Sequence, residues 1–151
     1  MTMIFQDVNA YPSLISPFVT VGVFDGVHLG HRALLDRLAL KAANAGRESV
    51  VITFDPHPEL VLPGPKDDLK FLSTPEEKME LLLRSGIDHI VVMPFTGELA
   101  AMDTGRFISE ILAGRIGAGF LLVGHDSHFG TGRDCGFDSI SRHAGLHGIG
   151  T

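Results

Sequence analysis

The apolar residues of this chain fall in short runs and helical stripes, a pattern that predicts strands alternating with helices. Residues 19–24 form a short apolar run rich in β-branched side chains, as expected of a strand buried on both faces. From His31 the spacing becomes helical, and Gly46 closes the segment. The apolar residues that share one stripe of this helix are Leu34, Leu35, Leu38 and Ala42.

The same pattern continues along the chain. Further strands are predicted at residues 49–53, 89–93 and 120–123. Further helices are predicted from Pro75 to Gly86, from Asp103 or Thr104 to Leu112, and near residues 138–144; Thr74, Pro75 and Glu77 form a helix start with a capping box. The residues expected to face the core from the first two of these helices are Met79, Leu82, Leu83, Phe107, Ile108 and Ile111.

Between these elements the sequence predicts loops. Residues 54–72 contain four prolines and are predicted as a long irregular loop, a kind of segment that usually has a function. Residues 124–136 form a second loop, rich in glycine and histidine, and residues 148–151 resemble the beginning of another strand. Strands alternating with helices imply right-handed βαβ units, so the predicted fold class is α/β, with helices on both faces of a parallel sheet.

Composition narrows the class of protein. A chain of 151 residues with 44% hydrophobic residues and a mean hydropathy of +0.23 is expected to form one domain with a sizeable core. The net charge of −6 and the lack of a basic cluster argue against binding to nucleic acid or to an anionic membrane surface. Cys135 is the single cysteine, so no internal disulfide is expected, and it is predicted to be inert. The first basic residue is Arg32 and no apolar run approaches a membrane span, so we expect neither signal peptide nor membrane segment and a cytoplasmic location.

The candidate chemistry gathers where the first strand gives way to the first helix. The polar and glycine residues of this turn are Asp25, Gly26, His28, Gly30 and His31. In open α/β sheets ligands bind at this edge, and a helix N-terminus there offers free N–H groups and a positive dipole end to a phosphate. The two imidazoles add further donors, so the sequence indicates a phosphate site.

The motif His28-Leu-Gly-His31 resembles the HxGH signature of the nucleotidylyltransferase superfamily. The wider string of residues 22–31 resembles the FMN adenylyltransferase (FAD synthetase) module of bacterial bifunctional riboflavin kinase/FAD synthetases. Further matches follow in the family's order at residues 53–58, 72–78, 95–98, 123–126 and 129–130. The resemblance implies a Rossmann-like nucleotidylyltransferase fold over residues 1–151.

The resemblance also implies a reaction, in which ATP and FMN give FAD and pyrophosphate with Mg²⁺ bound to the ATP phosphates. His28 and His31 are implied to be the catalytic residues. The residues implied to bind ATP are Gly22, Phe24, Asp25, Gly26 and Gly30. The residues implied to shape the flavin and phosphate region are Pro56, His57, Pro58, Asp126, Phe129 and Arg133. No residue is assigned as a metal ligand.

The chain departs from the family's pattern in three places. Ser127 stands where the family has an aromatic residue, and the S/T-S-T-x-x-R-like segment that grips the β- and γ-phosphates does not occur before Thr151. The riboflavin kinase domain of full-length relatives is also missing, so we expect no kinase activity from this chain. The sequence is therefore expected to be incomplete at its C-terminal end, either as a fragment of a longer protein or as a shortened relative.

Other interpretations remain open. The chain can be another HxGH nucleotidylyltransferase, such as a pantetheine-phosphate or cytidylyl enzyme, although the blocks at residues 56–58 and 126–130 speak against it. It can also be a catalytically silent module that binds a nucleotide or flavin. A zinc site of His28, His31, His125 and His128 is not expected, because the two pairs lie on separate loops without Cys or Glu spacing. The remaining histidines, predicted to be solvent-facing or structural, are His89, His143 and His147.

Overall fold

The computed structural model describes residues 3–6, 11, 14–22, 24, 29–55, 75–124 and 137–151. In chain order its elements are β1 (Met3–Phe5), β2 (Phe18–Val21), α1 (Leu29–Asn44), β3 (Ser49–Asp55), α3 (Pro75–Leu83), β4 (His89–Pro94), α4 (Gly97–Ala100), α5 (Thr104–Phe107), the π-helix η2 (Ile108–Ile116), β5 (Phe120–Leu121) and α6 (Phe137–Leu146). The predicted alternation of strands and helices is confirmed.

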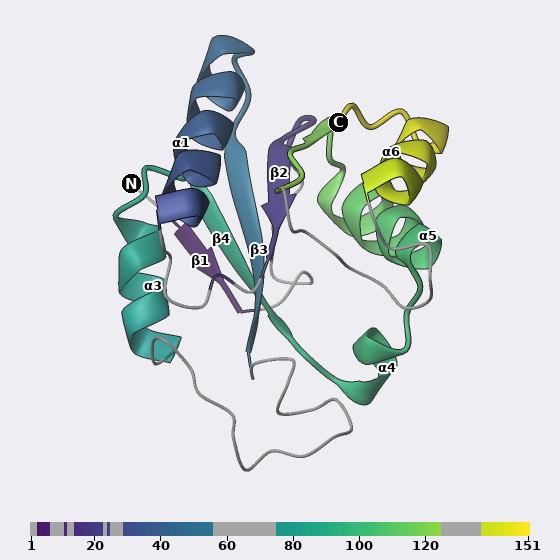
Figure 1. Ribbon diagram of the computed structural model, residues 1–151, viewed down its shortest axis with the longest axis horizontal. Coiled ribbons are helices and arrows are strands. Elements are labelled where there is room, and N and C mark those ends of the chain that lie inside the picture. Colours follow the sequence, from purple (N-terminus) through teal and green to yellow (C-terminus); the bar gives the residue numbers. More distant parts are fainter. Residues whose placement is uncertain are drawn as a thin grey trace.

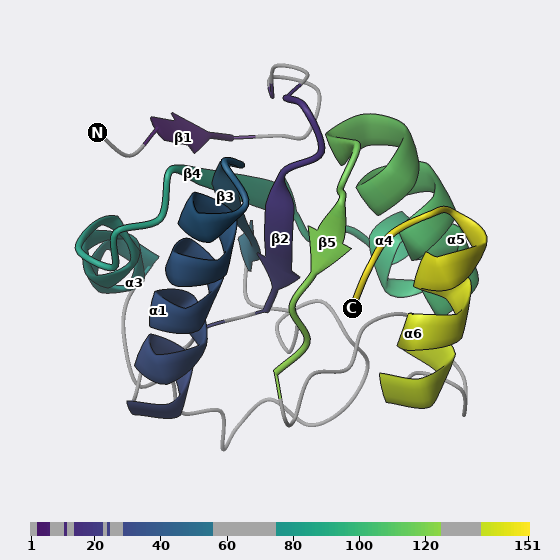
Figure 2. The ribbon, with the colours of Figure 1, turned by 90° about the horizontal axis from the view of Figure 1, so that it is seen from above.

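In the described part of the chain, five strands form one sheet in the order β1-β4-β3-β2-β5, and every pair in it is parallel. Val19 of β2 lies opposite Val50 on one side and Leu121 on the other. From β2 the chain proceeds to β3 and β4, and then returns to place β5 on the opposite side of β2. The helices α1 and α3 cover one face, and α4, α5 and α6 lie on the other (Figure 1 and Figure 2). The predicted fold class is therefore confirmed.

Both faces of the sheet are packed, which explains the apolar strand sequences. Along β3, Val50 and Ile52 belong to the core cluster under α5, η2 and α6, whereas Val51 points into the cluster under α1 and α3. All three valine and isoleucine side chains are fully buried. The stripe of α1 is confirmed at Leu35, Leu38 and Ala42, all buried, with Leu34 half-buried.

The predicted end of α1 is also confirmed. Gly46 has a φ of +68°, and the N–H of Arg47 donates to the carbonyl of Ala42 at 2.8 Å, which satisfies an otherwise unpaired helix carbonyl. Gly150 forms a parallel bridge with Phe120, so the strand-like character predicted for residues 148–151 is confirmed at that point.

Several predicted element bounds are wrong. β2 ends at Val21 rather than at residue 24, because Phe24 has a φ of +56° that no strand residue adopts. β3 continues to Asp55, into a segment predicted as loop, and β5 covers only two residues. The helix predicted to end at Leu112 continues as η2 to Ile116 and ends at Gly117, which has a φ of +71°.

Some features were not predicted or were placed wrongly. β1 has only three residues, and α4 is a single turn whose N-cap Thr96 accepts from the N–H of Leu99. Leu83, predicted to face the core, is 39% exposed. Leu82 takes the inward position on this helix, and the next residue, Leu83, is rotated away from the core. The predicted cap Thr74, most of the proline-rich loop, the loop after Gly124 and Cys135 lie outside the described residues. None of the helices in the described residues combines the length and apolarity needed to cross a membrane.

Candidate active site

The carboxyl ends of β2 and β5 lie side by side at the point where the strand order reverses. Beyond the strand register, the N–H of Leu122 donates to the carbonyl of Val19 at 2.8 Å. The Oγ1 of Thr20, which is fully buried, donates to the carbonyl of Leu122 at 2.9 Å. Ligands of open α/β sheets bind at such a reversal, outside the carboxyl ends of the strands. The predicted strand-to-helix site therefore lies at the edge where this fold binds ligands.

The helix α1 begins at the same edge (Figure 2). Its first turn, which includes Gly30 and His31, contains no acidic residue. The free N–H groups and the positive end of the helix dipole are therefore not offset by a carboxylate within that turn. An anion such as a phosphate is the ligand that this helix end favours.

His31 is half-buried and contacts the ring of Phe24. The two ring centroids are 5.2 Å apart with an interplanar angle of 74°, a T-shaped arrangement. Phe24 itself is only 3% exposed and belongs to the core cluster under α1 and α3. A Cβ added to Gly22 would lie 2.9 Å from Cε2 of Phe24, so a residue without a side chain is needed beneath the ring.

The structure thus brings together Gly22, Phe24 and His31, and it places Gly30 in the first turn of α1. These are members of the predicted ATP-binding and catalytic sets. The other predicted site residues lie outside the described residues, and they are Asp25, Gly26, His28, Pro56, His57, Pro58, Asp126, Phe129 and Arg133. Their roles stay predictions.

Lys78 also lies at this edge, and it was not among the predicted site residues. Its Nζ donates to the carbonyl of Phe54 at 3.2 Å, near the carboxyl end of β3. Phe54 is 8% exposed and packs against Phe95 in a T-shaped contact, with ring centroids 5.5 Å apart. The sequence did contain a signal that could have identified Lys78, because Lys78 and Phe95 both lie in blocks that resemble the family. Only the structure shows that Lys78 joins α3 to the strand end that precedes residues 56–58.

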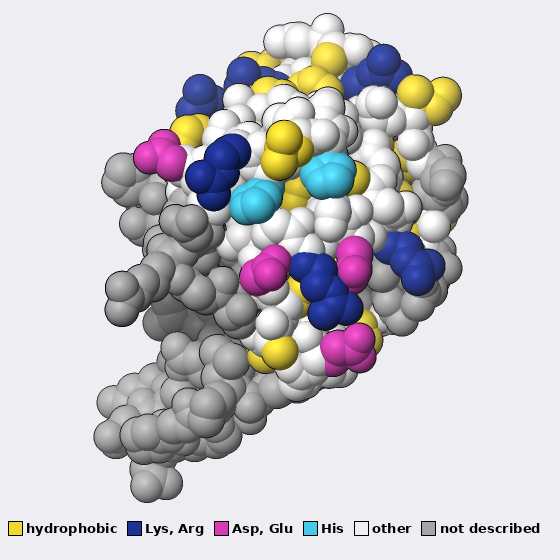
Figure 3. Space-filling view, turned by 90° about the vertical axis from the view of Figure 1, so that its right-hand side faces the viewer, with side chains coloured by type: hydrophobic (Ala, Val, Ile, Leu, Met, Phe, Trp, Pro, Cys, Tyr) yellow, Lys and Arg dark blue, Asp and Glu magenta, His cyan; other side chains and the backbone are white. Residues whose placement is uncertain are grey.

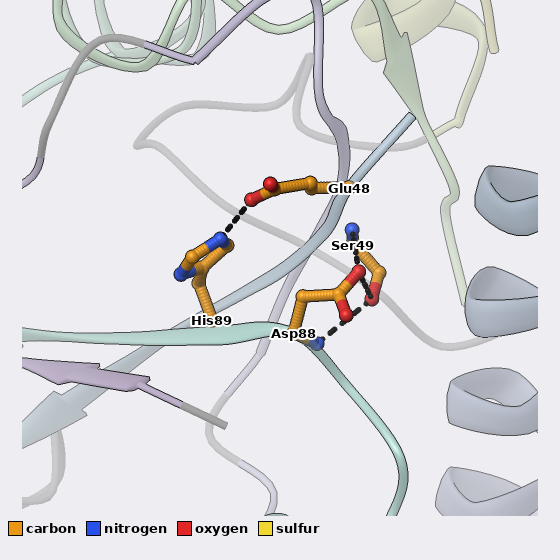
Figure 4. Close-up of polar contacts among 4 residues, drawn as sticks. All are labelled: Glu48, Ser49, Asp88 and His89. Carbon is orange, nitrogen blue, oxygen red and sulfur yellow. Dashed lines mark hydrogen bonds and ion pairs between the residues drawn. The ribbon is translucent and has the colours of Figure 1, made fainter. Parts of the chain in front are cut away.

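A second polar cluster lies at the amino ends of β3 and β4, at the opposite edge of the sheet (Figure 4). Asp88 Oδ2 accepts from the N–H of Ser49 at 2.9 Å, and Ser49 Oγ accepts from the N–H of Asp88 at 3.0 Å. His89, 8% exposed, pairs through Nε2 with Glu48. Of the two predictions for His89, solvent-facing or structural, the structural one is confirmed, because His89 is buried and this cluster joins neighbouring strands away from the candidate site.

The face over α5 and α6 carries charges of both signs (Figure 3). Arg106 Nε donates to Glu110 Oε1 at 3.1 Å, a hydrogen bond that raises the pKa of the guanidinium. A Cβ on Gly105 would lie 2.8 Å from Cε1 of His143, so this half-buried imidazole packs on the backbone of α5, while His147 is exposed. The described residues of this face therefore form a mixed surface without a large patch of one sign.

Comparisons with known proteins point to one family. Residues 13–151 match the FAD synthetase family. The chain is 35% identical over 119 residues to the bifunctional riboflavin kinase/FMN adenylyltransferase of Escherichia coli K12, covering 79% of this chain and 38% of that protein. It is 32% identical over 116 residues to the protein of the same description from Listeria monocytogenes, covering 77% and 37%. This chain therefore matches less than two fifths of the length of these relatives.

Among solved structures, one described as a macrolide-efflux protein from Streptococcus pneumoniae superposes with a TM-score of 0.77. The superposition covers 99% of this chain and 48% of that one at 23% identity, so it supports the fold alone. The family match, in contrast, spans nearly the whole chain and includes the strand ends, the turn and the first helix of the candidate site. The chain belongs to the FAD synthetase family.

Proposed function

We propose that this chain transfers the adenylyl group of ATP to FMN, giving FAD and pyrophosphate. The observation that carries the proposal is the place of His31. It lies in the first turn of α1, beside the carboxyl end of β2, within the segment that matches the FAD synthetase family. An imidazole there can donate to a phosphate that the helix N-terminus also attracts.

The reaction needs no protein nucleophile. An oxygen of the FMN phosphate attacks the α-phosphorus of ATP, and the bond from that phosphorus to the bridging oxygen of the β-phosphate breaks. Pyrophosphate leaves with the bonding electron pair, and the new phosphorus–oxygen bond completes FAD. The protein contributes by positioning two anions and by stabilising the charge that shifts between them.

We assign His28 and His31 to hydrogen bonding with the phosphates during bond breaking. Gly30 leaves the backbone open to close approach by the nucleotide. The other proposed ATP contacts are Asp25 and Gly26, and the proposed flavin and phosphate contacts are Pro56, His57, Pro58, Asp126, Phe129 and Arg133.

Mg²⁺ enters this proposal as part of the substrate, MgATP. In nucleotide sites the ion is held largely by substrate phosphates, with one or two carboxylates from the protein. No group of three or more His, Cys, Asp or Glu side chains that could hold a metal lies among the described residues.

The test is FAD formation by the purified chain from ATP, FMN and Mg²⁺. Removing either histidine should lower turnover by about 100-fold or more, the scale of losing one charge-stabilising donor, in His28→Ala and in His31→Ala. The matched control is His147→Ala, which removes an exposed histidine just after α6 and should leave turnover unchanged.

The outcomes separate the alternatives. Wild-type turnover in His31→Ala would remove that residue from the mechanism. A chain that binds FMN in a fluorescence titration but forms no FAD would favour a silent binding module. Product formation from another nucleotide or acceptor, in competition with ATP and FMN, would favour a different nucleotidylyltransferase.

A further inference from the structure

Phe24 combines two features that are rarely found together. It is a bulky residue with a left-handed φ of +56°, and its side chain is 3% exposed. Aromatic residues seldom adopt this backbone conformation, because Cβ then crowds the neighbouring carbonyl. Such backbone strain persists only where the surrounding structure holds it, and it clusters at functional sites.

The surroundings hold the ring of Phe24 from two sides. Below it, Gly22 leaves the space that any other residue would fill, since an added Cβ would come within 2.9 Å of Cε2 and 3.0 Å of Cζ. The ring cannot easily move away, because it packs in the same core cluster as Leu35 and Leu38 of α1. The positive φ of Phe24 and the missing side chain at Gly22 therefore serve one arrangement, a ring held between Gly22 and the core.

The fixed ring also contacts the imidazole of His31, with ring centroids 5.2 Å apart. His31 precedes Leu35 by four residues, so it stands at the head of the buried stripe of α1. A half-buried imidazole in the first turn of a helix has several rotamers open to it unless a neighbour excludes them. Phe24, through its T-shaped contact, is a neighbour that excludes some of these rotamers.

We propose that Phe24 is a positioning residue, which orients the His31 imidazole toward the carboxyl ends of β2 and β5, where the phosphates are proposed to bind. Gly22 is required because it makes room for the Phe24 ring. This inference rests on the proposed function of His31. It gives Phe24 a role through His31, in place of a direct contact with ATP.

The first experiment reads the imidazole directly, without any reaction. The C–H resonances of the eight histidines are recorded by NMR in the ligand-free chain, and His31 is assigned with His31→Gln. In Phe24→Leu, which keeps apolar bulk but loses the ring, the His31 signals should lose the shift caused by the ring. In Gly22→Ala, which pushes the ring aside, they should also move. The control is Ile90→Val, in the same core cluster but on β4, where the His31 signals should stay in place.

The second experiment is kinetic. Misplacing His31 should lower kcat about tenfold in both Phe24→Leu and Gly22→Ala, with the KM values for ATP and FMN within about twofold. The double variant should be no worse than Phe24→Leu alone, because the added methyl group then has no ring to displace. If Phe24→Leu does not fold, both the NMR and the kinetic measurements are made on Gly22→Ala alone.

The results distinguish this inference from the proposed function. Unmoved His31 signals in folded variants would overturn the positioning role, even if kcat fell. A rise in the KM for ATP with unchanged kcat would also overturn it, in favour of direct nucleotide contact. If the wild-type chain forms no FAD, the proposed function fails, and the NMR signals alone decide whether the ring of Phe24 lies against His31.

Discussion

The hydroxyl of Thr20 donates to the carbonyl of Leu122 at 2.9 Å, across 102 positions of sequence. This bond joins β2 to the residue that follows β5, the two strands that flank the reversal in strand order. β5 pairs with β2 at only two residues, so the Thr20 hydrogen bond adds a connection beyond the end of the backbone pairing. Both residues lie beside the candidate site, and the bond fixes the spacing of its two strand ends.

Replacing Thr20 by valine should therefore destabilise the protein. Valine has nearly the same shape, but it leaves the Leu122 carbonyl without this donor in a fully buried setting, at a cost of about 1–3 kcal/mol. Urea unfolding followed by circular dichroism measures the loss. Thr20→Ser, which keeps the hydroxyl, should retain more of the stability, and equal losses in the two variants would contradict the hydrogen-bond explanation.

Lys78 is expected to influence flavin binding through the end of β3. In Lys78→Met the apolar stem remains but the donor to the Phe54 carbonyl is lost. If residues 56–58 shape the flavin region, the KM for FMN should rise about fivefold, corresponding to about 1 kcal/mol for a partly buried hydrogen bond, with kcat nearly unchanged.

An exposed cation just after α3 provides the matched control for Lys78. Arg84 pairs with Glu80 at 2.5 Å in an exposed i,i+4 contact, so Arg84→Met should leave the KM for FMN unchanged. An equal rise in both variants would show a general charge effect, and no rise in Lys78→Met would separate Lys78 from the flavin region.

The strands and helices that could be predicted from sequence are those with enough residues to show a period. The sixteen residues of α1 repeat their buried stripe over several turns, and its end at Gly46 follows from a conformation that glycine adopts most easily. β1 could not be found in this way, because three residues, of which Met3 and Ile4 are exposed, carry no pattern.

The site was predictable in place but not in detail. The motif from Gly22 to His31 predicted a strand-to-helix site, and the topology puts the end of β2 and the start of α1 at the ligand edge of the sheet. The packing of Phe24 on His31 could not be predicted, since it depends on a left-handed backbone at an aromatic residue, which local preference disfavours. Tertiary packing prevailed over local preference there.

The hydrogen bond between Ser49 and Asp88 is expected to affect the stability of the protein but not its activity. Ser49 is 1% exposed, and its hydroxyl accepts from the N–H of Asp88 at the edge of the sheet opposite the candidate site. Ser49→Ala should cost about 1–3 kcal/mol of unfolding free energy, because it removes a partner from a part-buried N–H and from the Asp88 carboxylate. FAD formation below the unfolding transition should stay at the wild-type level. A fall in kcat would show that this cluster is coupled to the site.

Tyr11 should make the protein sensitive to alkali. Burial, with a smaller contribution from the Glu48 carboxylate, raises the pKa of its phenol above the ordinary value of 10.0, and no partner for the hydroxyl lies among the described residues. The fold therefore favours the neutral phenol, and its stability is kept below pH 10 and declines as the pH rises above it, because only the unfolded chain then ionises readily. As Tyr11 is the single tyrosine, the tyrosinate absorbance reports it alone: the midpoint should lie above 10 in the native chain and near 10 in urea. Tyr11→Phe should lose this part of the alkaline decline, and an ordinary midpoint in the native chain would show that the phenol is solvated.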